Sequence, residues 1–366
     1  MNRTDVLVVR PTDGGVAHVS SRIVAEFRRQ SRHVTDIALA ETAAPAWTGV
    51  LAALRSVRRI LRARVVHLEL GRTTAAPFWF GAVAVTLRRD VVIVAHDAPT
   101  LVDAPGAAVM PVKRGWRDAV AHKVFAPILN RPVLTYVRRR AGAVAVLSDM
   151  AARRCADTGF GRVGLINHGA DAPVPGPLPS QSRTVLFGGF LSPAKGLEDL
   201  LEMWRTVGSF TDYQLVIAGS ASRQHAEWVA RLQRDSAGMA NPPRWLGYLD
   251  DEAFNDLTAS AAIVVLPYRS SNPSSGILVR AMVQGRAIVA SRVTAMESLI
   301  DDGSTGRLVE TGDVEALTMQ VDALIRNPQE RDRLGAAAAE VAAARHTWQR
   351  QAEDLDRVYA VGGRRA

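Results

Sequence analysis

The sequence predicts an α/β protein made of two doubly wound domains, each with a parallel sheet covered by helices on both faces. Short apolar runs, typical of buried strands, alternate with longer helical stretches along nearly the whole chain. A proline-rich segment, "DAPVPGPLPS" at 171–180, interrupts this alternation at mid-chain and is typical of a semi-rigid linker. A length of 366 residues is enough for two domains, each with its own core.

The first half begins with "DVLVVRP", an apolar run that ends in the glycine turn "TDGG". Two stretches have the amphipathic pattern of helices, 17–30 and 47–63, and the second of them is basic. Short apolar runs predict strands at 5–11, 34–40, 64–70, 91–99, 141–148 and 163–167.

The second half repeats the alternation. Strands are predicted at 183–190, 213–220, 244–249, 261–268, 286–291 and 305–310. Helices are predicted at 196–207, 224–236, 251–260, 275–285, within the alanine-rich stretch 313–346, and at 347–362. The predicted organisation is therefore a first domain (1–170), a linker (171–182), a second domain (183–346) and a final helix (347–366).

The composition indicates an ordinary globular protein of a reducing compartment. Cys155 is the one cysteine of the chain, so a disulfide framework is excluded. The N-terminal apolar run, "VLVV", is too short for a signal peptide, and no run approaches the ~18 apolar residues of a membrane span. We therefore expect the protein in the cytosol or on the inner face of a membrane.

Positive charge is concentrated in the first half. The first 170 residues hold 25 Lys and Arg against 12 Asp and Glu, which favours an anionic partner such as lipid, nucleic acid or a phosphorylated substrate. The segment 111–142 mixes basic and aromatic side chains, as a segment lying on an anionic membrane does. A solvated helix pair covering the sheet is the alternative. Nucleic acid is disfavoured because no known binding module is present.

Two strand-to-helix turns of the second half are suited to holding phosphate. "FGGFLSPAKGLEDLL" (187–201) has glycines that allow close backbone approach and a lysine, Lys195, as a point charge. "PYRSSNPSSGILVRAMVQG" (267–285) has a second helix start at Ser275 and Gly276. Two such sites suit a diphosphate, although a surface lysine beside a structural turn is the alternative for the first. Neither matches a Walker A or a dinucleotide fingerprint, which argues against nicotinamide or flavin.

The order and spacing of these motifs resemble the C-terminal domain of glycosyltransferase family 4, retaining enzymes of the GT-B fold. "RPTDGGVAHVSSRIVAEF" (10–27) is similar to the family's Gly-Gly loop and first helix. "INHGADAPVP" (166–175) resembles the segment before its linker. "TWQRQAEDLDRVY" (347–359) resembles its closing helix, which crosses back to the first domain. The resemblance covers essentially the whole chain and is strongest over 183–310.

The resemblance implies two Rossmann-like domains with a cleft between them, the acceptor in the first and the nucleotide sugar in the second. The implied activity is retaining, metal-independent hexosyl transfer from a UDP- or GDP-sugar to a hydroxyl acceptor, without a cofactor. The acceptor, which can be lipid-linked, would belong to a bacterial cell-envelope polysaccharide or glycolipid. In such transfer the leaving diphosphate helps to deprotonate the acceptor, while the protein orients the substrates and stabilises charge.

The resemblance also assigns residues to the donor site. The expected donor contacts that follow the family pattern are Gly189, Lys195, Ser275, Gly276 and Ile277.

Three donor positions depart from the family pattern. The position of the family's diphosphate-binding arginine is Phe190, and Arg269 could supply the lost charge or be an exposed loop arginine. The two family glutamates, eight positions apart, are Asn272 and Arg280 here. Asparagine can still bind sugar hydroxyls. Arginine only donates hydrogen bonds, so it could hold a phosphate or ribose oxygen but not grip a diol through two acceptors.

In the first domain, His96 ends a predicted strand and resembles the family histidine that contacts the donor sugar near the reacting carbon. A hydrogen-bonded strand-end histidine is the alternative. Asp97 is either a turn cap or an acceptor-side base. His67 and Glu69 lie on the same side of one strand and are expected to form a satisfied buried pair, with contact to the cleft as the alternative.

Gly14 and Gly15 form the Gly-Gly loop expected on the acceptor side, and His168 is expected at the hinge. Two alternatives to envelope-glycan transfer stay open. One is transfer to a small soluble natural-product acceptor. The other is a catalytically inactive GT-B module that binds a glycan or an enzyme, for which the lost glutamates and arginine argue. The Lys195 turn and the Ser-Gly helix start argue against inactivity and favour a divergent branch.

Overall fold

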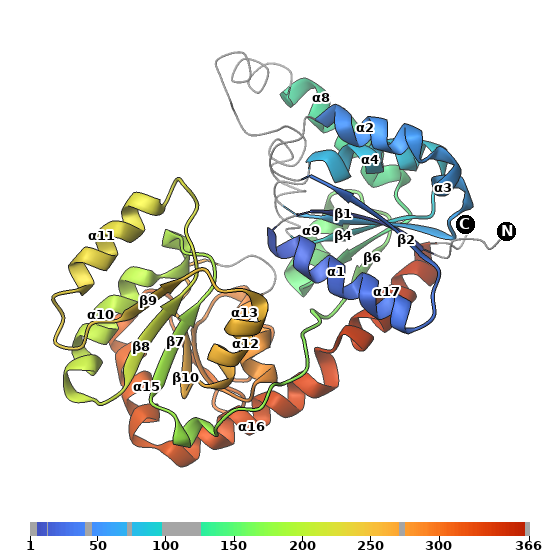
Figure 1. Cartoon of the computed structure of the whole chain (residues 1–366). Helices are drawn as coiled ribbons and strands as arrows, with labels where there is room; N and C mark the ends of the chain where they lie inside the picture. The colour runs from blue at the N-terminus through green and yellow to red at the C-terminus, as the bar shows by residue number, and fades with distance from the viewer. Residues whose placement is uncertain are drawn as a thin grey trace. The chain divides into compact units, whose positions relative to one another are not determined.

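The computed structural model describes residues 6–12, 14–40, 46–71, 75–96, 126–270 and 275–362. The chain divides into two units (Figure 1). Met1–Asn167 and Trp348–Ala366 form the first, and His168–Thr347 forms the second. Each unit contains a six-stranded sheet in which every described pair of neighbouring strands is parallel. The prediction of two doubly wound α/β sheets is confirmed.

The sheet of the first unit has the order β2-β1-β3-β4-β5-β6. Its strands are β1 (Val6–Pro11), β2 (Val34–Leu39), β3 (Val65–Leu70), β4 (Val91–Ala95), β5 (Ala143–Val146) and β6 (Val163–Leu165). The order reverses between β1 and β3, which is the switch point where loops leave in opposite directions and ligands bind in such sheets.

Helices cover both faces of this sheet (Figure 1). One face packs against α1 (Gly14–Arg29) and α17 (Trp348–Gly362). The other packs against α2 (Ala46–Arg55), α3 (Val57–Arg62), α4 (Ala75–Leu87), α8 (Ala126–Arg140) and α9 (Asp149–Asp157). Side chains of a strand alternate between the two faces. Val6 and Val8 of β1 therefore join the first core cluster and Leu7 and Val9 the second.

Three features of this unit differ from the sequence prediction. The helix expected over 47–63 is two helices, because the chain turns at the buried Ser56. Helix α4 was not predicted because "AAPFWFGAVAVTL" is apolar on all sides and lacks the amphipathic period. Helix α9, which was also not predicted, begins after Ser148, whose hydroxyl accepts from the N–H of Ala151.

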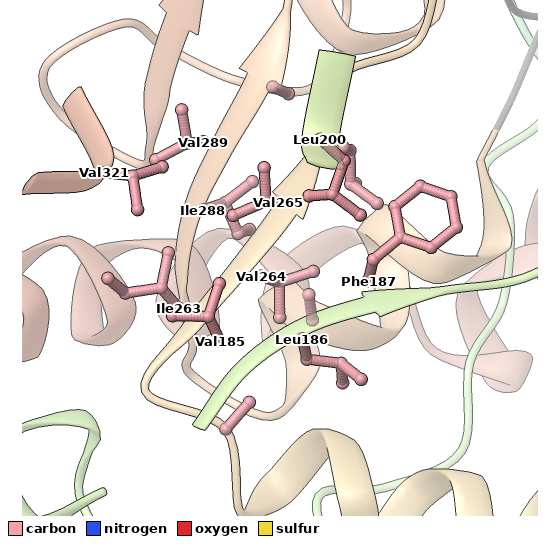
Figure 2. Close-up of a cluster of buried hydrophobic side chains, with 14 of the residues drawn as sticks. Val185, Leu186, Phe187, Leu200, Ile263, Val264, Val265, Ile288, Val289 and Val321 are labelled. Atoms are coloured by element: carbon pink, nitrogen blue, oxygen red, sulfur yellow. The ribbon is translucent and has the colours of Figure 1, made fainter. Parts of the chain in front are cut away.

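The sheet of the second unit has the order β12-β11-β10-β7-β8-β9, so its switch point lies between β7 and β10. Its strands are β7 (Thr184–Gly188), β8 (Gln214–Ala218), β9 (Arg244–Gly247), β10 (Ile263–Leu266), β11 (Ala287–Ser291) and β12 (Arg307–Val309). Figure 2 shows the core around β7 and β10, which includes Val185, Phe187, Val264 and Val265. In the same cluster, Val321 of a covering helix lies beside Val289 of β11. Runs that are apolar at every position suit strands covered on both faces.

The second unit contains seven described α-helices among residues 168–270 and 275–347. They are α10 (Leu197–Val207), α11 (Ala226–Ser236), α12 (Asp251–Ala259), α13 (Gly276–Val283), α14 (Thr294–Glu297), α15 (Val314–Arg326) and α16 (Pro328–Arg345). Short 3-10 turns lie at Pro179–Gln181, Pro193–Lys195 and Gly208–Phe210. The predicted helical stretch 313–346 breaks at Asn327, whose side chain caps α16 by accepting from the N–H of Glu330 at 3.0 Å.

The proline-rich segment is tied to the second unit by a buried arginine. The guanidinium of Arg286 donates to the carbonyl of Pro177 at 2.9 Å and to those of Ala259 and Ala261. Burial lowers the pKa of Arg286, and carbonyl oxygens satisfy its donors.

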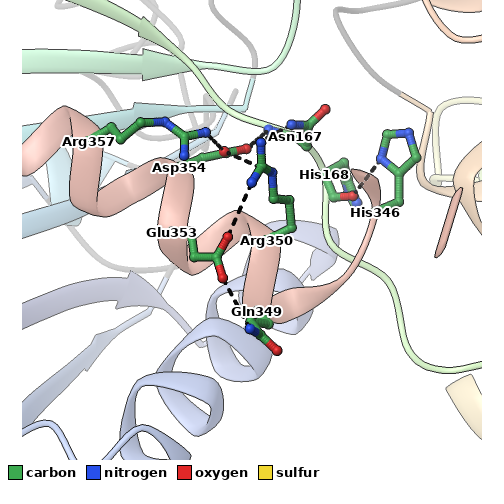
Figure 3. Close-up of polar contacts among 8 residues, drawn as sticks. All are labelled: Asn167, His168, His346, Gln349, Arg350, Glu353, Asp354 and Arg357. Atoms are coloured by element: carbon green, nitrogen blue, oxygen red, sulfur yellow. Dashed lines mark hydrogen bonds and ion pairs between the residues drawn. The ribbon is translucent and has the colours of Figure 1, made fainter. Parts of the chain in front are cut away.

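The chain passes between the units twice, at 167–168 and at 347–348 (Figure 3). In the first unit, the carboxylate of Asp354 in α17 accepts from the backbone and side-chain N–H groups of Asn167 at 2.9 and 2.8 Å. In the second, the N–H of Ala170 donates to the carbonyl of His346 at 2.9 Å. On each side of these two crossings, hydrogen bonds therefore hold the two chain segments together within one unit.

Candidate functional site

In the second unit, the loops that follow β7 and β10 meet at the switch point of the sheet. The backbone N–H groups of Arg269 and Ser270 donate to the carbonyl of Ala194, at 3.0 and 3.2 Å. The first loop leads to α10 and the second to α13. The two sequence motifs expected to hold phosphate are therefore joined by backbone hydrogen bonds, although the bonded residues lie about 75 positions apart in the chain.

Two glycines permit this close approach. Gly196 has φ +67°, and a Cβ at this residue would lie 1.8 Å from the carbonyl oxygen of Pro267. Gly189 has φ +118°, and a Cβ there would lie 3.3 Å from Cγ1 of Ile277. Both residues have a positive φ, which residues other than glycine rarely adopt. At Gly196 a Cβ would also collide with Pro267, whereas at Gly189 it would make a tight contact with Ile277. Gly189 and Ile277, two of the predicted donor contacts, are thus neighbours.

Lys195 is the last residue of the 3-10 turn before α10. Its ammonium nitrogen lies 3.6 Å from the centroid of the Tyr268 ring, so the aromatic face holds the charge beside the loop junction. Tyr268 is buried and follows β10. The sequence prediction missed Tyr268, because an aromatic residue at a strand end carries no signal of its own.

Ser275 caps α13, as a helix-start serine is expected to do. Its hydroxyl accepts from the N–H of Leu278 at 3.3 Å. The backbone N–H groups of Gly276 and Ile277 lie in the first turn, where a helix offers them no intrahelical acceptor. They point out of the N-terminal end of the helix, which carries the positive end of the helix dipole. His168 lies at the same helix end, with Nε2 3.7 Å from where a Cβ on Gly276 would be. The prediction placed His168 only at a hinge.

Arg269 and Arg280, both predicted as donor contacts, have protein partners. The guanidinium of Arg269 donates to both oxygens of Asp199, at 2.6 and 2.9 Å. Arg280 donates to Asp251 at 3.0 Å and lies 5.1 Å above the ring centroid of Phe254, both in α12. Asn272 lies outside the described residues.

Phe190, at the position of the family arginine, has 54% of its surface exposed. It follows Gly189 at the carboxyl end of β7. The end of the strand therefore presents an aromatic ring where the resemblance expects a cation.

In the first unit, Gly14 and Gly15 are the first residues of α1, not a loop before it. The predicted helix began three residues later, because glycine has poor helix propensity. A Cβ added to Gly15 would meet no atom within 4 Å, so the described packing does not by itself require glycine there. Both residues lie after β1, at the switch point of the first sheet.

His96 follows β4 and belongs to a chain of polar contacts on the α17 face of the sheet. Its Nε2 lies 2.5 Å from one oxygen of Glu69. The other oxygen of Glu69 lies 2.8 Å from Nε2 of His67, and Nδ1 of His67 lies 2.5 Å from the hydroxyl of Tyr359. Asp97 lies outside the described residues. The pair of His67 and Glu69 is buried, as predicted, and the structure adds a residue at each end.

Burial and the two histidines have opposite effects on the pKa of Glu69. Burial opposes ionisation of Glu69, but the two histidines outweigh it and lower the pKa of the carboxyl to about 2. Burial, together with the charge of Glu69, raises the pKa of Tyr359, so its hydroxyl keeps its proton. The sequence could not reveal Tyr359, which comes from the far end of the chain.

The outer face of α2 and α3 is both apolar and basic. Trp47, Leu51, Leu54 and Leu61 are 60, 39, 56 and 54% exposed. The exposed arginines among them are Arg55, Arg58, Arg59 and Arg62. We call these eight residues the α2–α3 surface.

The segment predicted to face a membrane, 111–142, lies only partly in the described structure. Residues 111–125 fall outside it, and the rest is mostly α8, where Tyr136 is 40% exposed and Arg139 is exposed. Within the described ranges, none of the helices combines the length and apolar character needed to cross a bilayer.

Part of the chain matches a known protein family. The model of the family "Glycosyl transferases group 1" matches residues 182–327, which contain both loops of the switch point. Over this stretch the chain is similar to that glycosyltransferase family. The structure of Anabaena Alr3699/HepE in complex with UDP superposes with a TM-score of 0.74 at 17% identity, covering 97% of this chain and 99% of that one. The GT-B fold predicted for the chain is confirmed.

Two curated relatives of the chain are mycobacterial. It is 34% identical over 192 residues to the phosphatidyl-myo-inositol mannosyltransferase of Mycobacterium leprae, covering 52% of this chain and 50% of the relative. It is 30% identical over 192 residues to the protein of that name in Mycolicibacterium smegmatis, covering 52 and 48%. The matched stretches span about half the length of these relatives.

Proposed function

We propose that the protein is a retaining hexosyltransferase that moves a sugar from a UDP- or GDP-sugar to a hydroxyl of a lipid-linked acceptor in the cell envelope. The second unit binds the donor and the first unit the acceptor. The donor diphosphate lies where the loops after β7 and β10 join, and the reaction needs no metal or other cofactor.

One structural observation supports this location of the donor site. The lysine turn is joined, through the carbonyl of Ala194, to the loop after β10 that leads to α13, at the switch point of one sheet. Lys195 supplies a full positive charge and the amides of Gly276 and Ile277 supply partial ones. Together they can stabilise the charge that grows on the leaving diphosphate, which is the main demand of this chemistry. Ser275 fixes the helix start that presents these amides.

Arg269 and Arg280 each form an ion pair with an aspartate, and these pairs indicate which residues position the donor loops and which contact the donor. Arg269 holds the second loop against α10 through Asp199, and Arg280 holds α13 against α12 through Asp251. We therefore assign both arginines to positioning the donor loops, and Lys195 to contact with the diphosphate. Gly189 and Ile277, which are packed together, form the wall beside the diphosphate.

The α2–α3 surface and the mycobacterial relatives support a lipid-linked acceptor. Apolar side chains beside arginines suit the boundary between lipid tails and anionic headgroups. The two mycobacterial relatives are named for a mannosyl transfer to a phosphatidylinositol lipid. We propose that the protein works on the inner face of the membrane, with the acceptor side of the first unit toward the lipid.

A binding screen tests the donor assignment. UDP, GDP, ADP, TDP and their common sugar conjugates are titrated calorimetrically into the whole protein, with and without EDTA. We expect one nucleotide to bind equally well in both conditions. Lys195→Ala should weaken that binding by about 10-fold or more, the loss of one charged hydrogen bond. Arg326→Ala, which removes an exposed cation on α15, is the control and should bind normally.

Other outcomes have distinct meanings. Binding that is unchanged in Lys195→Ala removes Lys195 from the diphosphate site. Binding that is lost with EDTA contradicts metal-independent transfer. If no nucleotide binds, the proposed enzyme is wrong and the alternative of an inactive GT-B binding module is favoured.

A further inference from the structure

The first unit contains an ionised carboxylate in its interior. A histidine connects this carboxylate to the carboxyl edge of the sheet. Glu69 is 1% exposed, and His67 is fully buried. An isolated buried carboxylate is strongly unfavourable, so its retention requires partners on both oxygens. Those partners are the two histidines, and the outer one, His96, lies just past the carboxyl end of β4.

Strand periodicity explains why these groups meet. Val65 of β3 and Val92 and Val94 of β4 belong to the core cluster under α1 and α17. Side chains two residues apart share a face. His67, Glu69 and His96 therefore lie on the α17 face of the sheet, where the hydroxyl of Tyr359 contacts His67.

The hydrogen-bond chemistry fixes the protons. An ionised carboxylate only accepts, so Nε2 of both histidines must carry hydrogen and donate to Glu69. In a neutral His67, Nδ1 is then an acceptor, and it receives the hydroxyl of Tyr359, which keeps its proton. In a neutral His96, Nδ1 is likewise the acceptor. It is the ring atom that the carboxylate does not hold.

We propose that Glu69, supported by His67 and by Tyr359 of the C-terminal helix, is a positioning residue that locks His96 in the Nε2–H tautomer. The Nδ1 atom of His96 thereby serves as the acceptor for a substrate hydroxyl at the carboxyl edge of the first sheet. Ligands of parallel α/β sheets bind at this edge.

This assignment gives α17 a part in the site. Tyr359 lies near the end of the chain, yet its hydroxyl is the last group in the polar chain that leads to His96. The ring of Tyr359 also packs edge-on against His67, with centroids 5.9 Å apart. The geometry of the strand-end histidine therefore depends on the correct docking of the final helix.

The tautomer is measured directly, without substrate. Two-bond ¹H–¹⁵N correlation spectra of the ¹⁵N-labelled whole protein report which nitrogen of each histidine carries hydrogen, and His96→Asn assigns the signal. We expect His96 and His67 both as Nε2–H. Glu69→Gln offers one acceptor in place of two, so the signal of His96 should move toward the Nδ1–H form. Glu26→Gln, a buried carboxylate of α1 paired with Arg29, should leave it unchanged.

Turnover is the second measurement, and only this part rests on the proposed function. Hydrolysis of UDP-glucose or GDP-mannose, with water as the acceptor, is followed by release of the nucleotide. Glu69→Gln should lower kcat by about 10- to 100-fold, as loss of a group that orients a functional histidine commonly does, with KM nearly unchanged. Tyr359→Phe should lower kcat by a smaller factor. Tyr213→Phe, a buried tyrosine of the second unit, is its control.

The outcomes separate the two proposals. An Nδ1–H signal for His96 in the unaltered protein overturns the positioning role, and so does a kcat that Glu69→Gln leaves unchanged. Tyr359→Phe gives the same test if Glu69→Gln does not fold. If the unaltered protein hydrolyses neither donor, the proposed transferase activity fails, while the spectra still decide the tautomer of His96.

Discussion

Arg269 and Asp199 form a two-point ion pair that binds the loop after β10 to the first turn of α10. The arginine is half exposed and the carboxylate is almost buried, at 8%. The carboxylate raises the pKa of Arg269, which stays charged. The pair therefore acts beside the loop hydrogen bonds to Ala194. It gives a protein partner to an arginine that the sequence analysis interpreted either as a donor contact or as an exposed loop residue.

We expect Asp199→Asn to loosen this loop junction. Loss of the pair should cost about 1 kcal/mol of local stability, which corresponds to roughly 5-fold faster amide exchange. Hydrogen exchange of peptides that contain Arg269 and Ser270 measures the effect. Asp235→Asn, an exposed aspartate of α11, is the control. Equal exchange in both variants would show that the backbone hydrogen bonds hold the loop without the ion pair.

Replacing Tyr268 by leucine should weaken nucleotide binding through Lys195. The ring that holds the ammonium is lost, and such a contact is worth about 0.5–1 kcal/mol, or roughly 2- to 5-fold in affinity. Tyr268→Phe keeps the ring and should bind normally. Calorimetry with the nucleotide that binds the unaltered protein makes the measurement. An equal loss of affinity in both variants would assign the effect to the hydroxyl instead.

Arg280→Glu restores the residue common in the family but faces Asp251 with a second carboxylate. We expect the melting temperature to fall by roughly 2–4 °C, since each kcal/mol corresponds to about that shift in a unit of this size. Adding Asp251→Arg should restore it by re-forming the pair with reversed charges. If Arg280→Glu instead leaves stability unchanged and tightens nucleotide binding, position 280 contacts the ribose and the positioning role is wrong.

Glu69 should make the first unit sensitive to acid. Its pKa is about 2 in the folded protein, below the ordinary value of 4.5. The folded state then binds fewer protons than the unfolded state between these values, so stability rises with pH there. The contribution of Glu69 is complete above about pH 4.5 and is lost as the pH falls toward 2. The groups that face it are His67, His96 and Tyr359.

Urea unfolding of the unaltered protein and of Glu69→Gln measures this contribution. The difference in unfolding free energy between the two should shrink as the pH falls below 4.5. A difference that is equally large at pH 3 and at pH 7 would contradict a depressed pKa for Glu69.

The α2–α3 surface should bind anionic vesicles. We expect Arg58→Glu combined with Arg62→Glu to weaken binding to vesicles of phosphatidylglycerol and phosphatidylcholine by 10-fold or more, at about 1 kcal/mol for each arginine. Sedimentation with the vesicles gives the affinity. Arg205→Glu combined with Arg326→Glu reverses two exposed arginines of the second unit and serves as the control. If the two double variants lose binding equally, net charge and not this surface attracts the membrane.

The sequence by itself determined the two parallel sheets and the two strand-to-helix turns after β7 and β10, because these depend on local pattern. Apolar runs mark the strands, and Gly196 and Ser275 carry their turn and cap chemistry in a few residues. The sequence also predicted the buried pair of His67 and Glu69 from spacing alone. It missed α4 because a helix that is apolar on every side has no amphipathic period.

Only the tertiary structure decided which distant groups share a contact. Asp199 with Arg269, and Tyr268 with Lys195, meet because the strand order places β7 beside β10. Tyr359 reaches His67 because the final helix docks on the first unit. These contacts join residues about 70 to 290 positions apart in the chain, and no local pattern encodes such a distance. The sequence therefore predicted the elements that carry these residues, and the tertiary structure determined which side chain each of them contacts.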